Sequence, residues 1–194
     1  MYHIKKVFHV TLLCILAIAV VGCFGASPEN VTKDFFSAVK DGDFNTAAKY
    51  VKQESKDEFR DELESGQDLD DKKRAELLFS KLSWEILSSS TEKNEAEVKA
   101  KVTSIDMVSV VTDVMNKILP LAFASAFDEN SNDDKIEELT EQYFDNAMSD
   151  PNAPTVTSEV TIKLVKEKGD WLIVPDDDLL NALTGNAGKL AEMF

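Results

Sequence analysis

After residue 27, the apolar residues first recur at the spacing of a helix. Between Val31 and Val39 they fall on one helical face. The residues before them, Ser27-Pro28-Glu29, supply an N-cap side chain, a proline at the first helical position and an acid in the first turn. Gly42 is suited to ending this helix, and Asp43 to capping a second one. The pattern predicts two short helices joined in a hairpin.

The apolar period changes from that of a helix to that of a strand at position 84. Trp84, Ile86 and Ser88 alternate with residues of the other face, and a second alternation follows over residues 98–102. Residues 92–94, between the two segments, are polar and suit a turn. These segments predict a first β-hairpin.

A second β-hairpin is predicted closer to the C-terminus. Apolar and polar residues alternate over residues 156–164, Lys168-Gly169 suits a tight turn, and an apolar run follows over residues 171–174. Asp176-Asp177-Asp178 then places three carboxylates where the positive end of a helix dipole favours them. A short last helix is therefore expected after this hairpin.

Residues 106–150, between the two hairpins, are predicted to form a helical insertion. Fourteen of the 21 residues from Met107 to Phe127 are apolar, and Asp106 can cap a helix that begins there. Residues 134–148 follow with a second helical pattern. A helix that is apolar on most sides is either a core helix or exposes apolar surface to a pocket or a partner. The candidates for such a contact patch are adaptable side chains of the first helix, Met107, Met115 and Phe123.

The order of these elements predicts one α+β domain over residues 28–194. Its N-terminal helical hairpin is expected to pack on a four-stranded antiparallel curved sheet, with the helical insertion between the two β-hairpins. Large apolar side chains should then meet between the first helix and the sheet, namely Phe35, Trp84, Val102, Ile162 and Trp171.

The start of the chain has the layout of a bacterial secretory signal. Lys5 and Lys6 precede an uncharged apolar run over residues 10–21, which is too short to cross a bilayer. The run leads into Val20-Val21-Gly22-Cys23, which resembles the lipobox of bacterial lipoproteins. An uncleaved anchor or an ordinary secretory signal is the alternative interpretation.

The lipobox resemblance implies a covalent modification and a location. Residues 1–22 would be removed as a lipoprotein signal peptide, and Cys23 would become a lipidated first residue, with residues 23–27 as a short tether. The expected location is the cell envelope, on the outer face of the cytoplasmic membrane or in the outer membrane. The membrane would then be a partner through the lipid on Cys23.

The chain that remains after removal of the signal has no histidine and one cysteine. His3, His9 and Cys14 all lie in the signal, so Cys23 is the cysteine left. This composition excludes disulfides within the domain, metal and haem sites of the His/Cys kind, and nucleophile arrangements that need imidazole. We therefore expect no cofactor and no metal, and the commonest general base of enzymes is absent.

Charge narrows the set of partners further. The formal net charge is −15, and it becomes −17 when the two lysines of the signal are removed. Binding to nucleic acid or to anionic headgroups relies on clustered Lys and Arg, so no nucleic acid is expected as a partner. Solubility outside the cytoplasm explains the charge most simply, and an acidic surface for a basic partner is the alternative.

Both ends of the predicted domain carry short motifs of a known family. Residues 28–44, which close with Lys40-Asp41-Gly42-Asp43-Phe44, and Ala47-Ala48-Lys49-Tyr50 after them are similar to the start of nuclear transport factor 2-like domains. Residues 168–173 are similar to the last hairpin of these domains. With the lipobox, the chain resembles bacterial lipoproteins of this superfamily. The resemblance implies a cone in which helices close over a curved sheet around a pocket.

The resemblance leaves two classes of function open, because this fold serves enzymes and binding modules alike. The first is a membrane-anchored, non-catalytic binding or interaction module, with a small apolar ligand or a protein partner. The alternative is a carboxylate- and tyrosine-based isomerase or lyase of the ketosteroid-isomerase-like type, with Asp106 as base beside Tyr50 or Tyr143. Core packing and helix capping explain these three residues equally well. The pocket or core candidates are Phe35, Tyr50, Trp84, Val102, Asp106, Tyr143 and Trp171.

The segment between the two insertion helices begins like a calcium loop. Asp128, Asn130 and Asn132 place oxygen ligands at alternate positions, as such a loop does. However, Asp133 stands where the loop requires glycine, and Leu139 stands where it requires glutamate. A solvated turn is therefore the preferred interpretation, with calcium as the alternative.

Overall fold

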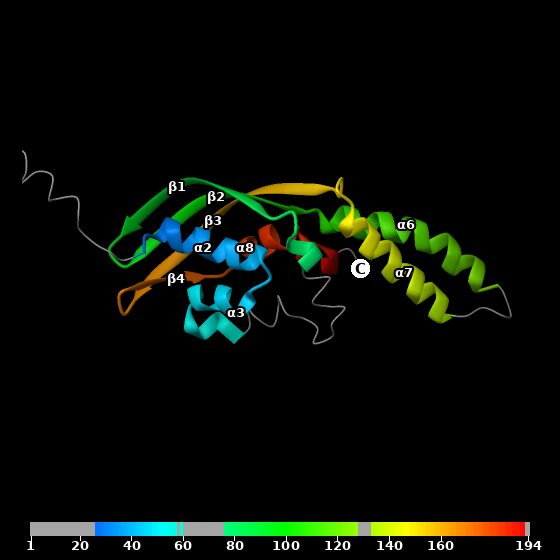
Figure 1. Cartoon of the computed structure of the whole chain (residues 1–194), viewed down its shortest axis with the longest axis horizontal. Helices are drawn as coiled ribbons and strands as arrows, with labels where there is room; N and C mark the ends of the chain where they lie inside the picture. Colours follow the sequence, from blue (N-terminus) through cyan, green and yellow to red (C-terminus); the bar gives the residue numbers. More distant parts are fainter. Residues whose placement is uncertain (1–25, 58, 60–75, 128–132, 193–194) are drawn as a thin grey trace, which may run out of the picture.

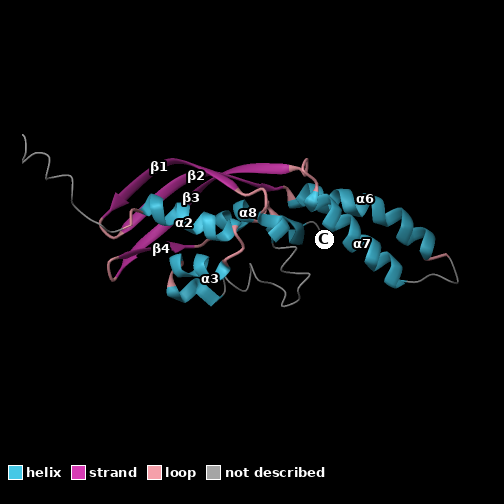
Figure 2. Ribbon diagram, viewed as in Figure 1, coloured by secondary structure: helices cyan, strands magenta, loops and turns pink. Residues whose placement is uncertain are grey.

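The computed structural model describes residues 26–57, 59, 76–127 and 133–192. Over these residues the protein is of the α+β class. Helices cover one face of an antiparallel sheet, and two further helices are inserted between its hairpins (Figure 1 and Figure 2). The predicted signal and the residues considered for calcium lie outside the described residues, as does Cys23.

Four strands form the sheet: β1 (Ser83–Glu92), β2 (Glu95–Ile105), β3 (Thr155–Glu167) and β4 (Asp170–Val174). They lie in the order β1-β2-β3-β4, and each is antiparallel to the next. The two hairpin turns place Lys93, Lys168 and Gly169 at positive φ, which matches the twist of the strands they join. The predicted fold class is confirmed.

The first strand departs from the predicted alternation at Leu87. Ile86 pairs with Ala100 but Ser88 pairs with Lys99, so β1 holds one extra residue between these pairs. Ala100 is buried and Lys99 is exposed, which places Ser88 on the opposite face from Ile86. The prediction that Ser88 shares the face of Ile86 was wrong, because a bulge shifts the alternation by one residue.

The first two helices begin at the predicted caps. The Ser27 hydroxyl accepts a hydrogen bond of 3.2 Å from a backbone N–H in the first turn of α2 (Pro28–Lys40). The Asp43 carboxylate accepts one of 2.9 Å in α3 (Phe44–Ala47). The second helix is only one turn long and continues in the 3-10 turns η1 (Ala48–Tyr50) and η2 (Gln53–Ser55).

The last helix, α8 (Asp177–Leu183), is tied to the sheet through its cap. The Asp176 carboxylate accepts a hydrogen bond of 3.1 Å from the Leu179 N–H and one of 2.9 Å from Lys163 Nζ on β3. The hydrogen bond from the Lys163 amine to the Asp176 carboxylate raises the pKa of Lys163. A 3-10 turn, η3 (Ala187–Glu192), follows the helix.

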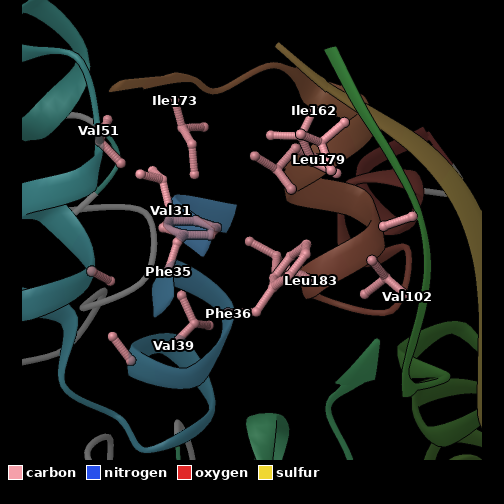
Figure 3. Close-up of a cluster of buried hydrophobic side chains, with 14 of the residues drawn as sticks. Val31, Phe35, Phe36, Val39, Val51, Val102, Ile162, Ile173, Leu179 and Leu183 are labelled. Carbon is pink, nitrogen blue, oxygen red and sulfur yellow. The ribbon is translucent and has the colours of Figure 1, made fainter. Parts of the chain in front are cut away.

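The core lies between the sheet on one side and α2 and α8 on the other (Figure 3). Phe35 and Phe36 of α2 are fully buried and lie 5.6 Å apart between ring centroids. Figure 3 shows them among side chains from α8 and from the sheet, including Leu183 and Val102. The interior between the sheet and these two helices is therefore filled by apolar side chains.

The insertion forms a pair of adjacent helices, α6 (Met107–Ser125) and α7 (Asp133–Ser149), which we call the arm. The arm connects the end of β2 to the start of β3, so it leaves the sheet at the end opposite the two hairpin turns (Figure 1). Its base is held by a second hydrophobic cluster that includes Ile105, Val110 and Met148. Figure 1 shows the rest of the arm projecting away from the sheet.

Candidate functional site

The groups considered for acid–base chemistry are not brought together. Asp106 caps α6, since its carboxylate accepts hydrogen bonds from the Ser109 N–H (3.2 Å) and the Ser109 hydroxyl (2.8 Å). Tyr143 lies beside Lys117, whose Nζ is 5.5 Å from the centre of the tyrosine ring. Lys117 is eleven residues along α6 from Asp106, or about 16 Å at the helical rise. Tyr50 packs against the main core, which lies between the sheet and helices α2 and α8.

The remaining pocket candidates are part of the core. Phe35 and Val102 are fully buried, and Trp171 is nearly so. Trp84 is half-buried and packs against Phe36, with ring centroids 5.4 Å apart. These side chains pack on one another, which is the arrangement of a filled interior.

The feature that core packing does not explain is the distal half of α6. Val110 and Val114, in the first half of the helix, are buried in or near the arm base. By contrast, Leu119 is 55% exposed, Phe123 69% and Phe127 75%. The helix is thus a core helix over its first two turns and a surface helix beyond them.

Leu119, Phe123 and Phe127 make up a continuous surface, which we call the apolar stripe. They are four residues apart, so they follow one face of the helix and the turn that ends it. The rings of Phe123 and Phe127 are in contact, with centroids 5.0 Å apart and planes at 66°. Towards the base, the same face carries the half-buried Met115 and the exposed polar residues Thr112 and Asn116. The apolar character is therefore concentrated at the far end of the arm.

The structure separates the three predicted contact residues. Phe123 is exposed and lies in the apolar stripe. Met115 is half-buried and lies one helical turn before Leu119. Met107 is buried in the cluster at the base, and is therefore unsuited to a contact patch, because β2 and α6 join at that point. Sequence reasoning missed Leu119 and Phe127, although their spacing of four residues on either side of Phe123 was a usable signal.

The second helix of the arm is strongly acidic. It contains six carboxylates, Asp133, Asp134, Glu137, Glu138, Glu141 and Asp145, against one lysine, Lys135. Glu137 and Glu138 are exposed on its surface. The arm therefore combines an apolar stripe on α6 with a negative field from α7 beside it.

Among the described residues, α6 is the one helix long and apolar enough to cross a membrane by length and composition. Only 17% of its apolar window is buried in the structure. Asp113 and Lys117 lie in its middle, and the helix contacts α7. We therefore treat α6 as part of a folded arm. In the described part of the chain, no group of His, Cys, Asp and Glu could hold a metal ion.

Comparison with protein families gives a match to half of the chain. Residues 21–117, half of the chain, match the family described as "Domain of unknown function (DUF4878)". The chain belongs to this family. The DUF4878 match includes Cys23, α2 and the first hairpin, and it ends within α6 at Lys117. The apolar stripe lies beyond the matched residues.

Two solved structures are similar to the chain at low scores. One is a SEC-C motif containing protein, RPA3114, from Rhodopseudomonas palustris, with 12% identity, a TM-score of 0.42 and 77% of each chain covered. The other is a "putative lipoprotein (ycdA)" from Bacillus subtilis, with 19% identity and a TM-score of 0.40. That match covers 87% of this chain and 47% of the Bacillus chain. No curated protein matches the sequence significantly. At these scores, neither neighbour informs on function.

Proposed function

We propose that this protein is a lipid-anchored interaction module of the bacterial cell envelope, which presents its arm to a partner protein without catalysing a reaction. The observation that carries the proposal is the apolar stripe, an exposed row of large side chains on a helix whose base is fixed in the core. Contiguous exposed apolar surface on a soluble domain is characteristic of a contact site.

The anchor is supported by the sequence and by the position of the first helix. Four residues separate Cys23 from Pro28, so the two Cα atoms can be at most about 18 Å apart when the segment is extended. Figure 1 shows that α2 begins near the hairpin turns, at the end of the sheet far from the arm. A lipid on Cys23 would thus hold one end of the domain at the membrane, and the arm would be free to reach outwards.

The fold supports a binding module over an enzyme. The helices that cover one face of the sheet, and the motifs at both ends of the domain, agree with the nuclear transport factor 2-like resemblance. Enzymes of that type need a base and a hydrogen-bond donor close together. In this chain the Asp106 carboxylate caps a helix, and Tyr143 lies along the arm. The apolar interior is packed with side chains, which favours a partner at the surface over a small enclosed ligand.

Replacement of the anchoring thiol is expected to abolish membrane attachment. In Cys23→Ser no thioether to diacylglycerol can form, so the protein should be released or remain as an uncleaved precursor. Stable attachment takes more than one acyl chain, and the acidic domain supplies no basic surface as a substitute. Cell fractionation, with mass spectrometry of the N-terminus, measures both outcomes.

Cys14→Ser is the matched control, because Cys14 lies in the segment that the proposal removes. This variant should be processed and anchored like the wild type. An unmodified Cys23 in the mature wild-type protein, or cleavage at another bond, would contradict the anchor.

The arm is tested separately by photo-crosslinking in the native membrane. A benzoylphenylalanine at position 123 of the full-length protein should give protein adducts, because that side chain stands out from the domain. The same group at position 116, on the polar part of the same helix face, should give far fewer. Equal yields from the two positions, or no adduct from positions 119, 123 and 127, would remove the arm as the contact surface.

A further inference from the structure

We propose that the partner binds the arm with an apolar groove whose rim carries lysine and arginine side chains. This inference rests on the proposed function, since it takes the arm as the contact surface. It adds the chemistry of the partner, which is inferred from the apolar stripe and from the charge of α7.

The apolar stripe has the size and composition of an anchor. Its three side chains extend from residue 119 to residue 127, or about 12 Å at the helical rise. Two of the three are phenylalanines whose rings already contact each other at 5.0 Å, so their positions are partly set before binding. Large aromatic side chains that enter a pocket contribute most of the energy of many interfaces. A helix face of this kind fits an apolar groove.

The negative charge of α7, beside the apolar stripe, indicates which charge the rim of the partner's groove carries. The helix α7 carries a net charge of −5, from six acids and one lysine, and Glu137 and Glu138 are exposed on it. The domain as a whole is also negative, with a formal charge of −15 for the full chain. Electrostatic complementarity accelerates encounter with a basic surface and disfavours an acidic one.

The same charges disfavour two other binding partners for the apolar stripe. A second copy of this chain would bring a second set of α7 carboxylates to the contact, and like charges repel. A bilayer surface with anionic lipids would face the same carboxylates, and a lipid on Cys23 would be tethered to the start of α2, at the opposite end of the domain from the arm. A protein with a basic rim has neither disadvantage.

The experiment uses the full-length protein in its native membrane, with benzoylphenylalanine at position 123. Mass spectrometry of the adduct identifies the attached molecule and the peptide within it. The expected result is a different protein, attached at an apolar segment with lysine or arginine on its surface nearby. Attachment to a lipid, to a second copy of this chain or to a segment with an acidic border would overturn the inference.

Charge reversal on α7 provides the second readout. The double variant Glu137→Lys/Glu138→Lys should lower the adduct yield by about fivefold or more, and 0.5 M salt should lower the wild-type yield similarly. The control is Glu92→Lys/Glu95→Lys, which changes the net charge equally at a cross-strand pair beside the β1–β2 turn. The control should crosslink like the wild type. An unchanged yield in the α7 variant would overturn the inference.

Different results would refute the proposed function and the basic rim of the partner. If position 123 crosslinks to a protein but the adduct yield depends neither on salt nor on the α7 charges, the contact surface stands and the basic rim is refuted. If no position of the stripe yields a protein adduct, the proposed function fails and the inference fails with it.

Discussion

Phe35→Ala is expected to lower the free energy of unfolding by about 3–5 kcal/mol, the usual cost of truncating a buried phenylalanine. The Phe35 side chain is fully buried and contacts the rings of Phe36 and Phe59, at centroid distances of 5.6 and 5.4 Å. Its removal leaves a cavity at the centre of the contact between α2 and the sheet. Domains of this size are stable by only about 5–15 kcal/mol, so the variant should be close to unfolding.

Urea unfolding followed by tryptophan fluorescence measures this change. Trp84 and Trp171 both pack against the main core, so their emission reports its loss. Leu119→Ala serves as the control, because it removes an exposed apolar side chain and should change the stability by less than about 0.5 kcal/mol. A loss below about 1 kcal/mol for Phe35→Ala would contradict the assigned core.

Gly185→Ala is expected to destabilise the protein by about 2–5 kcal/mol, because it combines backbone strain with a steric clash. Gly185 has φ +60°, and a Cβ there would overlap the backbone carbonyl of Ile105. The Gly185 carbonyl also accepts a hydrogen bond of 3.0 Å from the Met107 N–H, where α6 begins. The clash should therefore displace the base of the arm from the end of α8.

Gly169→Ala separates the two contributions. Gly169 has φ +104°, but a Cβ there would meet no atom within 4 Å, so only the backbone cost of about 1–2 kcal/mol is expected. Equal losses of stability for the two glycine variants, measured by urea unfolding, would show that the close approach of Gly185 to Ile105 is absent in solution.

Most of the fold could be predicted from the sequence because the signals were local. The caps at Ser27, Asp43 and Asp106 begin helices as expected, and alternation located both hairpins. The bulge in β1 could not be predicted, because Leu87 and Ser88 fit either face of a strand, and the choice depends on how the strand pairs with β2. Pairing is a property of two segments and is absent from the pattern of one.

The candidate site was predicted only in part, for a related reason. The apolar composition of residues 107–127 indicated a helix that is either buried or exposes apolar surface, and Phe123, one of the three contact candidates, is exposed. The division of the helix depends on what packs at its base, and those contacts come from η3 and from residues 77 and 78. They are distant in sequence, so Met107 could not be distinguished from an exposed residue by spacing alone.

The central claim is that the far half of α6 is a surface of a folded domain and is not part of its core. Urea unfolding of Phe123→Glu and Val114→Glu tests it directly, because both residues are apolar positions of one helix, 69% and 4% exposed respectively. The free energy of unfolding should change by less than about 0.5 kcal/mol in Phe123→Glu and fall by several kcal/mol in Val114→Glu, where a charge would be buried. Global unfolding of Phe123→Glu would contradict the claim.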